Sequence, residues 1–173
     1  MSIKLSPPQI ADEKDYYEMI DEFRKNNEPI IPKAIESEED ESFKDFIQRK
    51  IDRHEWKDLP NWYVPDSLFF IKDDNGKIVG WLNIRHELND FLREFWGHIG
   101  YWIKPSERKK WYATEGLKLG LQECRKIGIN EIILTCKKEN ISSAKVIENN
   151  GGIFDKEFIK DNIINQRWII SLV

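Results

Sequence analysis

The segment that most restricts the fold runs from residue 97 to residue 136, where a strand, a basic loop, a helix and a second strand follow one another. "GHIGYWIK" (97–104) has the pattern of a strand that Pro105 ends, and "EIILTC" (131–136) has that of a buried strand. Between them, apolar residues repeat at helical spacing over 113–127. A strand–helix–strand unit of this kind predicts an α/β domain in which the helix covers a sheet.

Two glycines in this helix, Gly116 and Gly120, lie one turn apart. Residues four positions apart share a helix face, so these glycines leave a strip without side chains. The strip is expected to face the sheet and to let the helix pack closely against it. Gly128 follows the last apolar position and is expected to end the helix.

The remaining sequence adds helices before this unit and strands on both sides of it. Residues 12–27 have helical spacing, and the acidic run 36–42 is expected to start a second helix. Residues 67–84 form two strand-like runs around Asn75-Gly76, a strong hairpin signal. A short helix at 142–150 and two further strands follow. This order predicts an α/β fold with three layers, α-β-α, and a mixed, mostly antiparallel central sheet.

Composition restricts the classes of function. The chain has 173 residues, enough for one domain, and a formal net charge of -4, which gives no general attraction to nucleic acid. The N-terminal "MSIKLSPPQI" lacks the apolar run of a signal peptide, and no stretch reaches about 18 apolar residues. Cys124 and Cys136 fall on apolar patterns and are expected in the core rather than in a disulfide or metal site. We therefore expect a cytoplasmic domain with no nucleic acid, membrane or metal partner.

The loop "PSERKKWYAT" (105–114) has the composition of an anion site. Arg108, Lys109 and Lys110 precede a helix N-terminus, whose N–H groups and dipole favour negative charge. Trp111 stands where close approach to a ligand favours glycine. Hydrogen bonds to phosphate at about 1.5–3 kcal/mol each outweigh one strained residue at about 1–3 kcal/mol, provided that the indole turns to solvent. The alternative is an ordinary turn with a solvated basic tip.

From about residue 69 onward the chain resembles the GNAT N-acetyltransferase superfamily, and within it a bacterial branch of predicted acetyltransferases. The resemblance is carried by "IGYWIKPSERKKWYATEGLKLGLQECRKIGINEIILTC", by "NISSAKVIENNGG" and, for the branch, by "GWLNIRHELNDFLREFWGH". The superfamily motif is Arg or Gln, two variable positions, Gly, one variable position, then Gly or Ala. Arg108 and Ala113 match it, and Trp111 stands at the central glycine. The resemblance implies a single domain over 1–173, with helices and an acceptor-side loop in 1–66 and the sheet and acetyl-CoA-binding core in 67–173.

The resemblance further implies an acetyl-CoA-dependent N-acetyltransferase that transfers an acetyl group directly to a primary amine of a small molecule or peptide. The main-chain N–H of Ile103 is expected to polarise the acetyl carbonyl. Asn140 and Ser143 are expected to contact the pantetheine arm, or only to cap the second helix. The residues expected to bind acetyl-CoA are Ile103, Arg108, Lys109, Lys110, Trp111, Tyr112, Ala113, Thr114, Asn140 and Ser143.

Many members of the superfamily carry a tyrosine seven residues after this asparagine, which protonates the leaving thiolate. Ile147 stands at that position. A thiol with a pKa of about 8.5 is a tolerable leaving group without a dedicated acid. Tyr101 or Tyr112 could take over the role, with packing as the alternative for both.

The attacking amine must be neutral, which requires a base or a water chain. Glu87, Glu94 and His98 are the candidates because they lie in or just before the sheet region expected to face the acceptor. A buried core histidine is the alternative for His98. The residues of an expected acidic mouth that attracts a cationic amine are His86, Glu87, Asp90 and Glu94, with Trp56, Trp62 and Trp96 beside them or in the core. Solvated loop charges are the alternative for the mouth, and 56–67 is expected to be an ordered loop.

Two other classes of function stay open at this point. Trp111 and Ile147 together suggest a catalytically degenerate GNAT-fold module that binds CoA or another partner. A structural or oligomer-forming domain that uses its seven tryptophans at an interface is a third reading. The sequence is also compatible with a homodimer.

Overall fold

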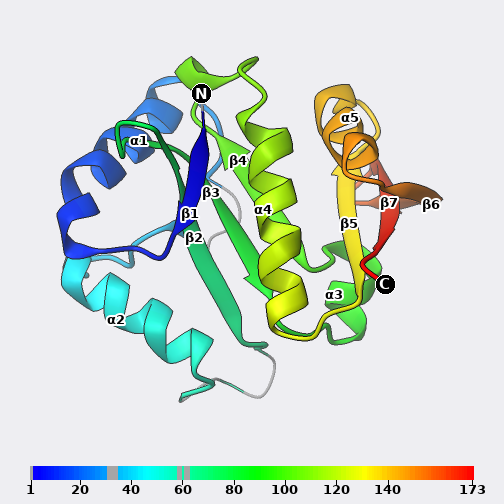
Figure 1. The fold of residues 1–173 in the computed structure, drawn as a ribbon, viewed down its shortest axis with the longest axis horizontal. Coiled ribbons are helices and arrows are strands. Elements are labelled where there is room, and N and C mark those ends of the chain that lie inside the picture. Colours follow the sequence, from blue (N-terminus) through cyan, green and yellow to red (C-terminus); the bar gives the residue numbers. More distant parts are fainter. Residues whose placement is uncertain (1, 31–34, 58–59, 61–62) are drawn as a thin grey trace.

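The computed structural model describes residues 2–30, 35–57, 60 and 63–173 (Figure 1). Its strands form two antiparallel sheets, in the orders β1-β2-β3-β4 and β5-β7-β6. The strands are β1 (Ile3–Ser6), β2 (Asp66–Asp73), β3 (Ile78–Arg85), β4 (Ile99–Ile103), β5 (Glu131–Lys137), β6 (Ile153–Lys160) and β7 (Ile163–Ser171). The helices are α1 (Glu13–Lys25), α2 (Phe43–His54), α3 (Asp90–Phe95), α4 (Tyr112–Lys126) and α5 (Ile141–Asn149), with short 3-10 turns η1 (Ile10–Asp12) and η3 (Pro105–Glu107).

Helices α1 and α2 cover one face of the first sheet, and α4 covers the other (Figure 1). Because neighbouring side chains of a strand point to opposite faces, each strand feeds two cores. Trp81 of β3 packs with the aromatic side chains of α1 and α2, whereas the adjacent Leu82 packs with α4. The three predicted layers are confirmed, with the strands divided between two antiparallel sheets.

The close approach of α4 to the sheet follows from its two glycines, as predicted. A Cβ atom on Gly116 would lie 2.9 Å from Cδ1 of Ile71, and one on Gly120 would lie 2.7 Å from Cδ1 of Leu82. Real Cβ atoms do not come so close to other heavy atoms, so larger residues would push the helix away. The sheet therefore fixes the position of the N-terminus of α4.

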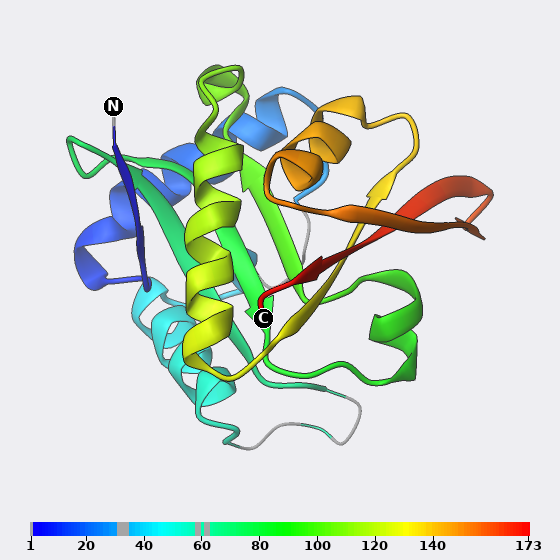
Figure 2. The ribbon, with the colours of Figure 1, turned by 45° about the vertical axis from the view of Figure 1, so that its right-hand side comes forward.

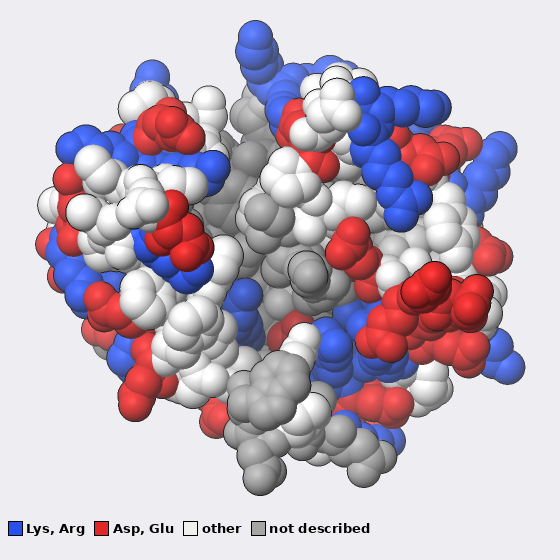
Figure 3. Space-filling model, turned by 180° about the vertical axis from the view of Figure 1, so that it is seen from behind, with Lys and Arg blue, Asp and Glu red and all other residues white. Residues whose placement is uncertain are grey.

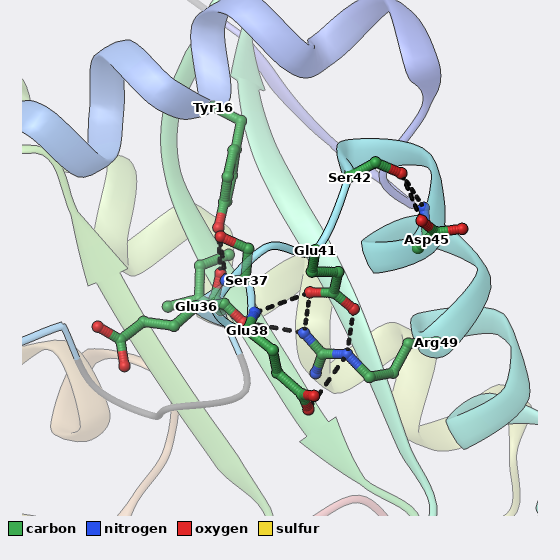
Figure 4. Close-up of polar contacts among 9 residues, drawn as sticks. Tyr16, Glu36, Ser37, Glu38, Glu41, Ser42, Asp45 and Arg49 are labelled. Atoms are coloured by element: carbon green, nitrogen blue, oxygen red, sulfur yellow. Dashed lines mark hydrogen bonds and ion pairs between the residues drawn. The ribbon is translucent and has the colours of Figure 1, made fainter.

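The acidic run 36–42 does not start a helix, which corrects the expectation from the sequence. Helix α2 begins at Phe43, after Ser42 accepts a hydrogen bond from the N–H of Asp45. The run forms a loop in which Arg49 of α2 binds Glu41 at 2.6 Å (Figure 4). This ion pair with Arg49 holds Glu41 close to α2 but outside the hydrogen-bonded turns of the helix.

Two elements are not in the sequence prediction, namely β1 and the short helix α3. The predicted 67–84 hairpin and the helices of 12–27, 113–127 and 142–150 are present, with ends that differ by one or two residues, and the final hairpin is present with a last strand that begins four residues earlier than the expected 167–172. Cys124 and Cys136 are buried and free, as expected. Residues 58, 59, 61 and 62 of the predicted 56–67 loop lie outside the described residues. Among the described residues, no helix has the length and apolar character that crossing a bilayer requires.

Candidate active site

Within the described residues, the strands of the two sheets meet at one end only. The main-chain N–H of His98 donates to the carbonyl of Ile133 at 2.7 Å, and the N–H of Ile133 donates to Nδ1 of His98 at 3.0 Å. Beyond this junction β4 pairs only with β3, and β5 only with β7. Figure 2 shows β4 and β5 diverging toward their C-terminal ends. Two strand edges therefore face each other across a widening gap.

The register of the ladders shows which main-chain groups face this gap. The N–H of Lys104 donates to Val79 and that of Arg85 to His98, so even-numbered residues of β4 bond to β3. The main-chain groups of Tyr101 and Ile103 consequently point away from β3, toward β5. By the same argument Thr135 of β5 faces β4, because even-numbered residues of β5 bond to β7. The predicted N–H of Ile103 is thus on the gap side of its strand.

The N-terminus of α4 is open. Trp111 occupies the N-cap position with a left-handed backbone, φ 50° and ψ 14°, and no side chain caps the helix. No described residue accepts a hydrogen bond from the N–H of Ala113 or Thr114. The Trp111 side chain is 55% exposed, so the indole turns to solvent, which is the condition that the sequence analysis set. This first turn presents main-chain donors to an anion.

The basic residues of the loop have different partners. The guanidinium of Arg108 binds both carboxylate oxygens of Glu28, at 2.8 and 2.6 Å, and lies over the Phe23 ring. Lys110 binds Glu107 at 2.8 Å, which raises the pKa of Lys110. Lys109 is exposed and has no carboxylate partner among the described residues. The main chain, more than these side chains, is therefore the prepared part of the anion site.

Tyr101, Ser143 and Asn140 come together across the gap. The Tyr101 hydroxyl lies 2.9 Å from Oγ of Ser143, and Oδ1 of Asn140 accepts the Ser143 N–H at 3.1 Å. Asn140 therefore caps α5, the alternative that the sequence left open. Burial raises the pKa of Tyr101, so its hydroxyl stays protonated. Ile147 is fully buried in the core.

Tyr112 is 5% exposed and packs in the core beneath α4. Ala113 is partly buried against the same core, whereas the carbonyl of Thr114 accepts a hydrogen bond from Asn150 of α5 at 3.1 Å. These contacts hold the first turn of α4 against the rest of the domain.

The three candidate bases have separate surroundings. Glu94 of α3 binds Lys156 at 2.7 Å and lies 3.6 Å from Arg167. His98 is 7% exposed, and burial, followed by the nearby arginines, lowers its pKa to about 4, so it is a neutral part of the sheet junction. Glu87 is exposed and makes no ion pair with a described residue.

The residues of the expected acidic mouth have different surroundings. Nε2 of His86 lies 2.7 Å from Oγ of Ser67, and Asp90 lies in the first turn of α3. Trp96 is 38% exposed beneath Nζ of Lys160, Trp56 is exposed after α2, and Trp62 lies outside the described residues.

Sequence reasoning missed one polar group of residues, which lies beneath α2. Its members are Lys50, Arg53, Asp66, Asn83 and Arg85. The only available signal was Lys50, which falls four residues after Phe46 on the apolar stripe of α2. Among the described residues, no group of three or more His, Cys, Asp or Glu side chains is placed to hold a metal ion.

Comparisons with known proteins give one family. A model of the "Acetyltransferase (GNAT) domain" family matches residues 2–153. No curated protein sequence matches the chain.

Several solved structures share the fold. The ribosomal L7/L12 α-N-protein acetyltransferase RimL, in complex with coenzyme A, has a TM-score of 0.71 at 14% identity over 99% of this chain and 95% of that one. The microcin C7 self-immunity acetyltransferase MccE, in complex with acetyl-CoA and AMP, has 0.67 at 18% over 98% and 92%. A dodecameric spermidine N-acetyltransferase from Vibrio cholerae has 0.66 at 16% over 98% and 94%.

Proposed function

The chain belongs to the GNAT acetyltransferase family, and we propose that this acetyl-CoA-dependent enzyme acetylates the primary amine of a small molecule or peptide. The observation that carries the proposal is the pairing of an open helix N-terminus with the free edge of β4. The first can bind a diphosphate, and the second can bind an extended amide chain. Acetyl-CoA contains both groups, so the residues present fit it.

Each part of the gap then has its own task. The N–H groups of Ala113 and Thr114 bind the diphosphate, with Lys109 adding charge at the rim. The edge groups of Tyr101 and Thr135 bind the pantetheine amides. The N–H of Ile103 donates to the acetyl oxygen as negative charge develops there. Bound in this way, acetyl-CoA supplies a thioester carbon that forms a bond to the amine nitrogen while its bond to sulfur breaks; the nitrogen loses one proton to a base, and the thiolate takes up one from solvent.

We assign Tyr101 to the sulfur. Its hydroxyl replaces the tyrosine that the family often carries where this chain has Ile147. The Tyr101 hydroxyl donates to the Ser143 carbonyl at 3.4 Å, a long bond that the phenol can exchange for one to the leaving sulfur while its oxygen accepts from Oγ–H of Ser143 at 2.9 Å. Because burial raises the pKa of Tyr101, the residue acts by hydrogen bonding rather than by giving up its proton.

For the base we retain Glu87, because Glu94 is ion-paired and His98 is neutral inside the junction. An exposed carboxylate can take a proton from the amine directly or through water. A Glu87→Gln variant should shift the pH profile of kcat/KM toward higher pH, whereas Glu94→Gln should leave the profile in place.

The comparisons do not specify the acceptor, because the named neighbours act on spermidine in one case and on a ribosomal protein in another. Our proposal therefore specifies only the group that is acetylated, a primary amine. A cytoplasmic location and a homodimer stay predictions from the sequence.

The test is thiol release from acetyl-CoA over a panel of amines, with calorimetric titration of acetyl-CoA in parallel. We expect saturable binding and amine-dependent release. Binding without release across the panel would support the degenerate CoA-binding module instead. Tyr101→Phe should lower kcat about 10- to 100-fold with little change in KM for acetyl-CoA, since a lost charged hydrogen bond costs about 1.5–3 kcal/mol. Ser143→Ala, which leaves the phenol in place, should have a smaller effect.

A further inference from the structure

We propose that the buried polar residues beneath α2 bind an acidic group of the acceptor, so that the acceptor is an amine that also carries a carboxylate or a phosphate. We call these residues the α2 cluster: Lys50, Arg53, Asp66, Asn83 and Arg85. The inference rests on the proposed function and specifies its substrate class.

The cluster occupies one face of the first sheet. Asp66 and Arg85 are directly opposed in the β2–β3 register. Side chains two positions apart in a strand share a face, so Asn83 and Arg85 lie on the side of Trp81, which packs beneath α1. Lys50 comes from α2, which packs against β2. Elements far apart in the sequence thus bring the five side chains together opposite the α4 face.

Four of these residues have buried polar atoms that lack a hydrogen-bond partner in the part of the chain that the structure describes. Lys50 and Asp66 are each 5% exposed and Asn83 is 1% exposed. Their Nζ, Oδ1 and Oδ1 atoms have no hydrogen-bond partner among the described residues, and neither has Nη1 of Arg53. Buried polar atoms are nearly always satisfied in folded proteins, so a concentration of them on one face indicates a place for a polar ligand.

The charges of the α2 cluster do not balance. Arg53 and Arg85 are cationic, Lys50 becomes a third cation when it is protonated, and Asp66 is the single carboxylate among the five. Arg85 donates from Nη1 to the carbonyl of Gly97 at 2.8 Å, a neutral partner. Lys50 lies over the Phe46 ring and Arg53 over the Tyr63 ring, contacts that compensate buried charge only in part, and an anion with several lone pairs would compensate it further.

The neighbouring acids do not fill this need. Glu41 lies near Lys50, but Arg49 already holds its carboxylate at 2.6 Å and also lies 3.7 Å from Glu38 (Figure 4). Burial, and then the charges of Arg53 and Arg49, lower the pKa of Lys50 to about 7. Lys50 is therefore poised to take up a proton when an anion arrives.

The position suits an acceptor. Arg85 donates its main-chain N–H to His98, and Asn83 is paired with Gly100, so the α2 cluster borders β4 directly. Acetyl-CoA would enter along the α4 side, and the acceptor along the side away from α4. Viewed from that side, the described surface carries both basic and acidic side chains (Figure 3).

Matched acceptors test the proposal. β-Alanine and O-phosphoethanolamine are compared with ethanolamine in the thiol-release assay with saturating acetyl-CoA. We expect kcat/KM to be at least about tenfold higher for one acidic amine than for the neutral one. The carboxylate and phosphate arms show which acidic group fits. Equal values for all three amines would overturn the proposal.

Variants locate the effect in the cluster. Lys50→Met should reduce kcat/KM for the preferred acidic amine about 10- to 100-fold relative to kcat/KM for ethanolamine. Asp66→Asn, which removes the competing carboxylate, should change the preference in the opposite direction. Lys44→Met, at an exposed position of the same helix, is the control and should change neither. Loss of discrimination in the control, or its retention in Lys50→Met, would contradict the assignment.

Failure of catalysis and failure of the anion site can be told apart. If no amine is acetylated, the proposed function fails, and the anion site is tested by thermal shift on enzyme saturated with coenzyme A, which occupies the α4 site. β-Alanine or phosphoethanolamine should then stabilise the wild-type protein and Lys44→Met, but not Lys50→Met. Equal shifts in all three proteins would overturn the site independently of turnover.

Discussion

The two faces of the first sheet prepare their chemistry in different ways. On the α4 face the prepared groups are main-chain N–H donors, at the open helix N-terminus and along the β4 edge. On the α2 face they are side chains, Lys50 and Asp66 among them. Main-chain donors survive a change of side chain, which is why tryptophan can stand at a glycine position of the motif. The α2 face does not tolerate substitution in this way, because each of its charges belongs to a side chain and is lost when that residue is replaced.

The largest effect is expected at the junction between the two sheets. Because the junction positions the groups on both faces of the first sheet, a substitution there should affect both faces at once. A Cβ atom at Gly97 would lie 2.2 Å from the carbonyl oxygen of Ile133, and the backbone there has φ 66°. We expect Gly97→Ala to destabilise the protein by about 3 kcal/mol or more, measured by urea unfolding. The control is Gly76→Ala, with φ 80° but open space around it, which should cost about 1 kcal/mol. Equal losses would mean that the junction tolerates the clash.

A charge placed on the α4 face should separate binding from stability. Thr114→Glu puts a carboxylate in the first turn of α4, where we place the diphosphate. Acetyl-CoA binding should weaken at least about 100-fold, by repulsion, although the helix dipole favours the new charge by about 0.3–1 kcal/mol. Calorimetry and thermal unfolding measure the two effects. Thr114→Gln is the uncharged control, and equal weakening by both variants would indicate steric exclusion instead.

On the α2 face, pH should act through Lys50. Its pKa is lowered to about 7 in the folded protein, so between that value and its unfolded pKa of about 10.4 the unfolded chain binds the extra proton. Stability therefore rises with pH above 7, by up to about 1.4 kcal/mol per pH unit, and the gain is lost as pH falls. The nearby charges are Arg49 and Arg53, with Asp66 and Glu41 opposing them.

Lys50→Met should lack this slope from pH 7 to 9, measured by urea unfolding at constant ionic strength. Lys44→Met should keep it. Parallel curves for wild type and Lys50→Met would show that Lys50 is charged in the folded protein throughout this range.

The smallest effect is expected where the sequence raised the strongest doubt. Trp111→Gly removes a left-handed non-glycine residue and should change stability by about 1 kcal/mol or less, since relief of strain is offset by a more flexible unfolded chain. Affinity for acetyl-CoA should stay within about threefold, because the N–H remains. A large gain in affinity would show that the indole obstructs the site.

The sequence predicts the α4 face of the first sheet better than the α2 face. Gly116 and Gly120, the Asn75-Gly76 turn and the basic loop are local signals, and each leads to the α4 face or the sheet. Strand β1 and helix α3 have four and six residues, too few for a reliable period. The direction of the Trp111 ring depends on a backbone angle that no residue pattern gives.

The α2 cluster was beyond sequence reasoning for a different reason. Lys50, Asp66 and Arg85 lie on three elements, and only the β2–β3 register and the packing of α2 bring them together. Each charge taken alone is typical of a solvated surface. The ion pairs that neutralise Glu94 are equally non-local, since Lys156 and Arg167 come from β6 and β7.

The single junction at His98 has a mechanical consequence. No described strand lies between β4 and β5, so the junction at His98 is where the two strands are joined. The distance between their C-terminal ends therefore depends on the groups that fill the space between them. A donor molecule bonded to both edges acts as the missing middle strand and turns two small sheets into one. Amide hydrogens along β5 should then exchange with solvent more slowly in the loaded enzyme than in the empty one, far from any residue that touches the acyl group.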